Sequence, residues 1–214
     1  MLKWRNNSSV LIQCAHTMPM FIDMARLTYQ RHAAYCTSHG MDYWHLIGHP
    51  CPERDTGAWD KVHLIKQALD DGYEFVAWLD TDAAIVGDTP LTEALPVDAY
   101  IGGCEHDGNA EADIPRHINV GVLYLRNTEQ TRTFVDAWHA SYPAPGRWQE
   151  QGSFNELMSA IDCVTVIDDK WNSTVNVNES PDPVVMAWHG VWPVAKRLDM
   201  MRKKLRGDYL KYRV

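Results

Sequence analysis

Two carboxylates separated by one residue, Asp80 and Asp82, directly follow the wholly apolar segment 75–79. An apolar run without alternation is typical of a strand covered on both faces, and open α/β sheets bind ligands beyond the carboxyl ends of their strands. In extended backbone, residues i and i+2 project to the same side, so we expect both carboxylates to address one divalent cation. Such an ion keeps positions for a diphosphate and stabilises charge on a leaving phosphate. In the alternative, one Asp caps a turn and the other is solvated.

The preceding chain alternates strands and helices, which places these carboxylates at the edge of a sheet. Residues 9–15 and 43–47 are typical of strands. A helix between them is capped by Thr17, begins near Pro19 and ends at Gly40. A second apolar stripe over residues 59–70 predicts a second helix. Because crossovers between such units are right-handed, the order predicts a parallel α/β sheet. Later strands are expected at 100–103, 120–125, 164–167 and 184–188, and later helices at 127–142, capped by Asn127, and at 154–161.

The composition is that of an ordinary globular protein. The 214 residues are 45% hydrophobic and 22% charged, which excludes disordered, collagen-like and disulfide-scaffold proteins. No apolar run approaches the roughly 20 residues that span a membrane, and the amino end is too polar for a signal peptide. The five cysteines are odd in number and scattered, which predicts free thiols in a reducing cytoplasm.

Charge separates the chain into an acidic body, residues 1–194, and a basic tail, residues 195–214. The tail has eight basic and two acidic residues, a net charge of +6, which leaves −14 for the body. An acidic body is a poor nucleic-acid binder. The tail also has apolar and aromatic members, so it suits an anionic membrane surface carrying a lipid-linked acceptor. The alternative is a terminal helix that packs on the body.

Several motifs resemble a family of glycosyltransferases. The block W-L-D-T-D-A at 78–83 resembles the D-x-D signature of GT-A enzymes that use nucleotide sugars. With Trp59-Asp-Lys61, the segment 119–127, Gln149-Glu-Gln151, Trp171-Asn172 and His189-Gly190, it follows the order of the fungal mannan galactosyl- and mannosyltransferases and plant xyloglucan xylosyltransferases. The resemblance covers about residues 55–190 and implies a single Rossmann-like GT-A domain with a mostly parallel sheet flanked by helices.

The same resemblance implies a reaction and a set of donor-binding residues. The family transfers a sugar with retention from a UDP- or GDP-linked donor to a glycan or lipid-linked acceptor, with Mn²⁺ (or Mg²⁺). Asp80 and Asp82 would hold the metal, Asp80 would also contact the donor, and His189 would be the third metal ligand. Lys61 would reach a phosphate. The residue types alone leave His189 as a structural histidine and Lys61 as a solvated lysine.

The resemblance also assigns residues around the sugar. Asn119 would hydrogen-bond the donor sugar and Gly121 would let it approach the backbone, although the family usually has Thr where this chain has Val120. Gln149, Glu150 and Gln151 correspond to the segment beside the reacting carbon. There Gln149 would bind substrate, and Glu150 or Gln151 would stabilise positive charge on the sugar. Asp107, next to His106, is a further candidate on the acceptor side. The alternatives are structural roles, with Asn119 in a turn, Gly121 in a bulge and residues 149–151 at the start of a helix.

Three rival functions share some of these features. A haloacid-dehalogenase-like phosphatase also carries D-x-D after a buried strand, with Asp168-Asp169 as a later acidic pair. Two α/β units precede the motif here, however, and Ala84 stands where that motif prefers Thr or Val. A non-catalytic nucleotide- or glycan-binding module would bind without turnover. A glycosyltransferase acting on modified DNA would use the basic tail, against which the acidic body argues.

Overall fold

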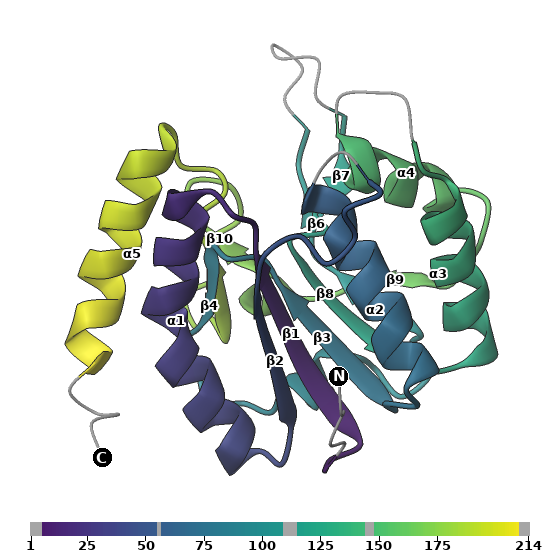
Figure 1. The fold of residues 1–214 in the computed structure, drawn as a ribbon, viewed down its shortest axis with the longest axis horizontal. Coiled ribbons are helices and arrows are strands. Elements are labelled where there is room, and N and C mark those ends of the chain that lie inside the picture. The colour runs from purple at the N-terminus through teal and green to yellow at the C-terminus, as the bar shows by residue number, and fades with distance from the viewer. Residues whose placement is uncertain (1–5, 55–56, 109–114, 144–147, 210–214) are drawn as a thin grey trace.

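The computed structural model describes residues 6–54, 57–108, 115–143 and 148–209, which build a mixed sheet between two layers of helices (Figure 1). The six strands are ordered β2 (Asp42–Ile47), β1 (Ser9–Ala15), β3 (Phe75–Leu79), β8 (Val122–Arg126), β5 (Ile101–Gly103) and β9 (Val164–Val166). The β1 strand is parallel to β2 and β3, and β5 is parallel to β9, whereas β8 runs antiparallel to β3 and β5. The predicted α/β fold with a mostly parallel sheet is confirmed.

Five helices of the described chain cover this sheet. On one side lie α1 (Pro19–Ser38) and α5 (Val194–Tyr209), and on the other lie α2 (Asp60–Asp70), α3 (Glu129–Ala140) and α4 (Gln149–Met158) (Figure 1). The side chains of β1 alternate between the two layers. Val10 and Ile12 pack with α2 and α3, whereas Leu11 packs with Tyr35 of α1. Because β3 is buried on both faces, its sequence is apolar without alternation.

Two predicted helix caps are wrong. Met18, not Thr17, precedes α1, and it makes no capping hydrogen bond through its side chain. Thr128, not Asn127, caps α3, and its hydroxyl accepts a hydrogen bond from the amide of Thr131. The Asn127 side chain instead donates to backbone carbonyls at the end of α2. The helix after Thr17 nevertheless begins at Pro19, as predicted, whereas the cap signal at Asn127 misplaced the start of α3.

Short strands after β3 connect the sheet to the later chain, and the sequence pattern did not predict most of them. A three-stranded sheet has the order β10 (Ser173–Thr174), β11 (Val185–Ala187) and β4 (Ala83–Ile85). A hairpin is formed by β6 (Glu105–His106) and β7 (His117–Ile118). The antiparallel pairing of β11 with β4 brings the end of β11 beside residues 80–82. That pairing therefore decides which late residues reach the site.

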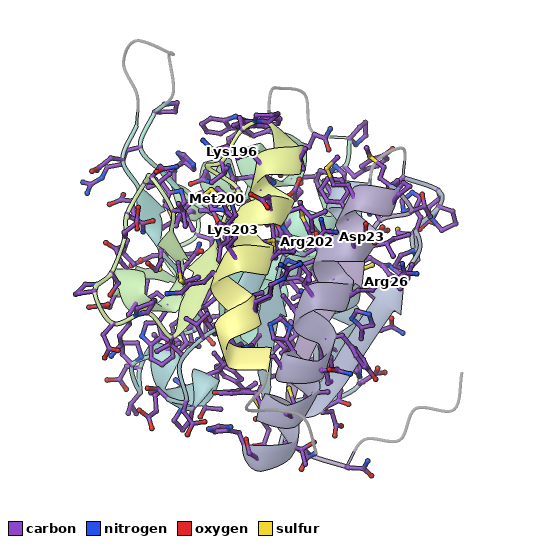
Figure 2. The ribbon with its side chains drawn as sticks, turned by 90° about the vertical axis from the view of Figure 1, so that its left-hand side faces the viewer. Asp23, Arg26, Lys196, Met200, Arg202 and Lys203 are labelled. Atoms are coloured by element: carbon purple, nitrogen blue, oxygen red, sulfur yellow. The ribbon has the colours of Figure 1, made fainter. Side chains whose placement is uncertain are left out.

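The predicted basic tail begins with α5, which packs beside α1 (Figure 2). Leu198, Met201 and Leu205 are buried together with Met24 of α1. The opposite face is exposed and carries Lys196, Arg202, Lys203, Lys204 and Arg206. Residues 210–214 of the tail lie outside the described chain. None of the helices described here combines the length and apolar character needed to cross a bilayer.

All five cysteines are free thiols, as predicted. Burial raises the pKa of Cys36 to about 12 and that of Cys163 to about 11. These two thiols are therefore protonated at neutral pH and contribute as small apolar side chains.

Candidate functional site

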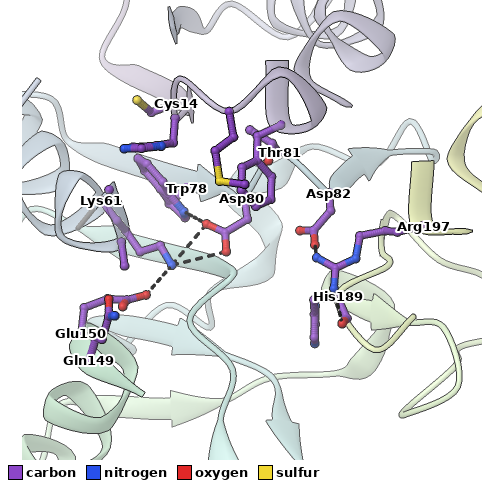
Figure 3. A pocket seen from close by; sticks show the side chains of 15 residues that line it. Cys14, Lys61, Trp78, Asp80, Thr81, Asp82, Gln149, Glu150, His189 and Arg197 are labelled. Carbon is purple, nitrogen blue, oxygen red and sulfur yellow. Dashed lines mark hydrogen bonds and ion pairs between the residues drawn. The ribbon is translucent and has the colours of Figure 1, made fainter. Parts of the chain in front are cut away.

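A cleft of about 650 Å³ opens beyond the carboxyl ends of β1 and β3 (Figure 3). Its floor includes Asp80, Thr81 and Asp82, and its walls come from the segments that follow β1, precede α2 and begin α4 and α5. Fifteen residues line it: Cys14, His16, Met18, Phe21, Gly57, Ala58, Lys61, Trp78, Asp80, Thr81, Asp82, Gln149, Glu150, His189 and Arg197. Six predicted site residues are thus brought to one cavity: Lys61, Asp80, Asp82, Gln149, Glu150 and His189.

The two aspartates lie in a turn rather than in extended backbone. The β3 strand ends at Leu79, and the amide of Ala83 donates to the carbonyl of Asp80 at 3.0 Å, which closes the turn. The geometric reason given for a shared cation, parallel projection of i and i+2, is therefore wrong. Both side chains still face the cleft, but each contacts a different basic residue (Figure 3).

Asp80 is held by a buried lysine and an indole. Lys61 Nζ lies 3.2 Å from Asp80 Oδ1 and 3.2 Å from Glu150 Oε1, and the Trp78 indole N–H donates to Asp80 Oδ1 at 2.7 Å. Burial alone would lower the pKa of Lys61, but the neighbouring Asp80 and Glu150 carboxylates raise it above its usual value. Lys61 is thus a permanent cation in the cleft, not a solvated lysine.

Asp82 is paired with a residue that the motif analysis did not select, Arg197 of α5. The guanidinium Nη1 of Arg197 contacts Asp82 Oδ2, and its Nη2 donates to the carbonyl of His189 at 2.7 Å. Both charged side chains are only 8% exposed. Burial raises the pKa of Asp82 to about 6, against the opposing effect of Arg197. A cation that binds Asp82 must therefore compete with this arginine.

His189 is positioned by the pairing of β11 with β4. Within the described chain, its buried Nε2 has no hydrogen-bond partner. Burial, followed by the charges of His106 and Arg197, lowers the pKa of His189 to about 3, so the imidazole is neutral. A neutral imidazole with a free nitrogen is the form that binds metals.

The types of donor in the cleft suit a divalent metal ion. Two carboxylates on the floor of one cleft and the unpartnered imidazole of His189 form a suitable donor set for Mn²⁺, and the carboxylates alone suit Mg²⁺. The donor atoms of Asp80, Asp82 and His189 are not gathered within 4.8 Å of one another. In the described chain such a gathering occurs instead at Cys51, Glu53 and His63.

Three other predicted residues lie beneath the cleft and support Asp80. The Asn119 side-chain oxygen accepts from the amide of Gly121 at 3.0 Å, and Gln151 Oε1 accepts from Asn119 and from Val120 N. A Cβ added to Gly121 would lie 3.2 Å from Asp80 Oδ2. The same Cβ would lie 2.9 Å from Asn119 Oδ1, so the two side chains leave room at this position only for glycine, and the predicted approach of a donor sugar stays a prediction. None of Asn119, Gly121 and Gln151 lines the cavity.

Asp107 also lies apart from the cavity lining. Its side chain is 90% exposed and is 3.5 Å from Arg116. Its neighbour His106 is buried and stacks on His189, with ring centroids 5.0 Å apart. His117 continues the row of rings, 5.8 Å from His106 and 4.6 Å from Trp148. These rings form an aromatic ledge, composed of His106, His117 and Trp148, that begins beside His189; the ring of His106 is buried, and those of His117 and Trp148 are partly exposed.

Gln149 begins α4 with a strained backbone. Its φ of 45° lies in the left-handed region, which is uncommon for a residue other than glycine. Such conformations persist where the surrounding structure holds them, often at functional sites. Gln149 and Glu150 reach the cleft from this helix start, whereas Gln151 points beneath it.

The fold and this cleft define a glycosyltransferase of the GT-A type. Residues 49–163 match the profile of the nucleotide-diphospho-sugar transferases. Since that match covers more than half of the chain, the protein belongs to the nucleotide-diphospho-sugar transferase family. Membership in a transferase family decides against the phosphatase and the non-catalytic module. A search of curated protein sequences finds no match.

Several solved glycosyltransferases share the fold. One is involved in glycosylation of the major capsid of PBCV-1 and is 19% identical, with a TM-score of 0.71 over 91% of this chain and 99% of that one. The galactosyltransferase LgtC, solved with donor and acceptor sugar analogs, is 11% identical, with a TM-score of 0.56 over 92% and 99%. Mouse xyloside xylosyltransferase 1 is 11% identical, with a TM-score of 0.52 over 85% and 98%.

Proposed function

We propose that the protein is a metal-dependent enzyme that transfers a sugar from a UDP- or GDP-linked donor to a glycan or lipid-linked acceptor, with retention. The observation that carries this proposal is the cleft itself, where Asp80, Asp82 and the unpartnered imidazole of His189 meet the cations of Lys61 and Arg197. A diphosphate carries negative charge, which the cations of Lys61 and Arg197 and a metal ion held by the carboxylates can neutralise.

Asp80, Asp82 and His189 would hold Mn²⁺ or Mg²⁺. When bound, the metal supplies positive charge that stabilises the departing nucleoside diphosphate. In the transfer, the bond between the sugar carbon and the phosphate oxygen breaks, and a bond from the acceptor hydroxyl oxygen forms. The hydroxyl proton passes to a phosphate oxygen of the departing nucleoside diphosphate or to solvent, so atoms and charges balance.

Each predicted residue has a place in this reaction. Lys61 fixes Asp80 and adds positive charge beside the leaving group. Glu150 brings a carboxylate into the cleft, where it can stabilise positive charge on the sugar. Asn119, Gly121 and Gln151 are positioning residues because they contact Asp80 or one another beneath the floor.

The acceptor is proposed to bind along the aromatic ledge. Trp148 precedes Gln149, and the ring of His106 stacks on His189, so the ledge adjoins two residues that line the cleft. Sugar rings pack on aromatic faces through their C–H groups. Asp107 stays a candidate acceptor contact at the exposed end of β6.

The basic tail suggests where a lipid-linked acceptor would be met. The exposed residues of α5 form a positive face on an acidic body, which suits the headgroups of an anionic membrane (Figure 2). Five free thiols fit a reducing compartment, so we place the enzyme in the cytoplasm. Nucleic acid remains a poor partner for the acidic body.

A panel of nucleotide sugars tests the function. With Mn²⁺ or Mg²⁺ present, the protein should release free nucleotide from at least one UDP- or GDP-sugar, and chelation should stop the release. Asp82→Asn should abolish metal-dependent release while the far-UV circular dichroism spectrum stays unchanged. Asp98→Asn, at an exposed carboxylate, is the matched control. Release by Asp82→Asn at the parent rate would show that the site is misassigned.

A further inference from the structure

A second group of metal-binding side chains lies outside the cleft. The Cys51 sulfur, a Glu53 carboxylate oxygen and a His63 ring nitrogen all lie within 4.8 Å of one another. The Cys51 thiol donates to Glu53 Oε1 at 2.8 Å. None of the three residues lines the cleft. Two come from a turn and the third from α2, so the group joins separate segments.

The donor types favour zinc over the hard ions that suit the cleft. Zinc binds sulfur, imidazole nitrogen and carboxylate oxygen at bond lengths that separate tetrahedral ligand atoms by about 3.5 Å. The three donor atoms need only small side-chain adjustments to reach that spacing. His63 also lines a groove of about 300 Å³ together with His139, so this ligand can be reached from solvent.

The backbone of the turn is already fixed relative to α2. The buried Asp60 carboxylate accepts from the amide of Cys51 at 3.0 Å and from His49 Nδ1 at 2.8 Å. The Arg54 amide donates to the Cys51 carbonyl at 3.0 Å, which closes the turn. His49 Nε2 also contacts the Arg54 carbonyl at 2.7 Å. The ligands would therefore lose little additional freedom on binding a metal.

We propose that Cys51, Glu53 and His63 form a zinc site that fastens the turn 51–54 to α2 and keeps one coordination position for water. On binding, the Cys51 S–H bond breaks, a sulfur–zinc bond forms and the proton passes to solvent, with no change in oxidation state. Water completes the tetrahedral coordination.

The site bears on the cleft through the chain that follows it. Gly57 and Ala58 lie shortly after the turn and line the cleft, and Asp60 and Lys61 begin α2. A zinc ion at the turn would steady one wall of the donor site. This inference goes beyond the proposed function, because the zinc site requires no particular reaction in the cleft.

Cobalt provides a test that is independent of activity. Metal-free protein titrated with Co²⁺ should develop near-ultraviolet sulfur-to-cobalt absorption at one equivalent. The absorption should disappear in Cys51→Ser and fall sharply in His63→Gln. It should persist in Cys14→Ser, whose sulfur lines the cleft, and in Asp82→Asn. Absence of the absorption in the parent protein, or its persistence in Cys51→Ser, would overturn the proposal.

Thermal unfolding gives a second measurement. In an Asp82→Asn background, which removes a ligand of the cleft metal, zinc at about 100 times its dissociation constant should raise the Tm of the protein and of its Cys14→Ser variant by about 5–10 °C. In the same background it should leave Cys51→Ser, Glu53→Gln and His63→Gln unshifted or nearly so. The Tm values of the metal-free variants show whether each is folded, and His63 and Glu53 are not buried. An equal zinc shift in all variants would contradict the assignment.

Discussion

Replacement of Lys61 by methionine removes the cation shared by Asp80 and Glu150. The Lys61 side chain is 4% exposed, Glu150 is 10% exposed and Asp80 is 38% exposed. Removing one partner of a buried ion pair costs about 3–5 kcal/mol, because the remaining charge is left uncompensated. Since Asp80 keeps contact with water, we expect Lys61→Met to lower the free energy of unfolding by about 3 kcal/mol.

A double-mutant cycle separates this charge effect from lost packing. Glu150→Gln removes one of the two carboxylates, so Lys61→Met should cost less in that background. The expected coupling free energy is about 1–2 kcal/mol. Nucleotide release should stay low in the double variant, because the cation beside the leaving group is still missing.

Urea unfolding monitored by circular dichroism measures these free energies. Lys66→Met is the matched control, because Lys66 lies on the same helix and pairs with Asp70 and Asp136 at the surface. It should cost less than about 1 kcal/mol. The reasoning is refuted if Lys61→Met costs no more than Lys66→Met, or if the effects of Lys61→Met and Glu150→Gln add within about 0.5 kcal/mol.

Three further outcomes are expected. Arg197→Met should lower the Tm of the metal-free protein, because it leaves Asp82 buried and unpaired. Mn²⁺ should then raise the Tm of this variant more than that of the parent, and an equal rise would contradict a competition between Arg197 and the metal for Asp82. Burial and then the charge of Arg31 lower the pKa of His32 to about 3, so on acidification the unfolded chain takes up the proton first. Between about pH 6.5 and pH 3 this histidine should therefore lower the free energy of unfolding by about 1.4 kcal/mol per pH unit, and the loss should be smaller in His32→Gln, in urea titrations. Trp148→Ala should raise the acceptor KM about threefold to tenfold with donor hydrolysis unchanged; an unchanged acceptor KM would exclude the ledge.

The sequence predicted the site residues best where they directly follow a single strand. The apolar run 75–79 and the carboxylates after it are local signals, so Asp80 and Asp82 could be placed at the sheet edge without a structure. Their turn could not be predicted, because it depends on Asp80 N bonding the carbonyl of Gly121 and Trp188 N bonding the carbonyl of Asp82. Those contacts join distant segments.

Arg197 shows the limit of motif reasoning. Its sequence context, a run of basic residues, indicated either a membrane-contacting tail or a terminal helix packed on the body, and its partner Asp82 lies 115 positions earlier. Only the packing of α5 on α1 brings the two together. Trp78 is different, since it lies two residues before Asp80 and its indole N–H had to bond somewhere when buried. That signal was present and was not used.

The ion pair between Asp82 and Arg197 of α5 has a practical consequence for protein engineering. Judged from the sequence, a truncation after residue 194 removes only a charged tail. It would delete the guanidinium opposite Asp82 and uncover the apolar side chains of α1 that α5 now shields. Such a truncation product should aggregate.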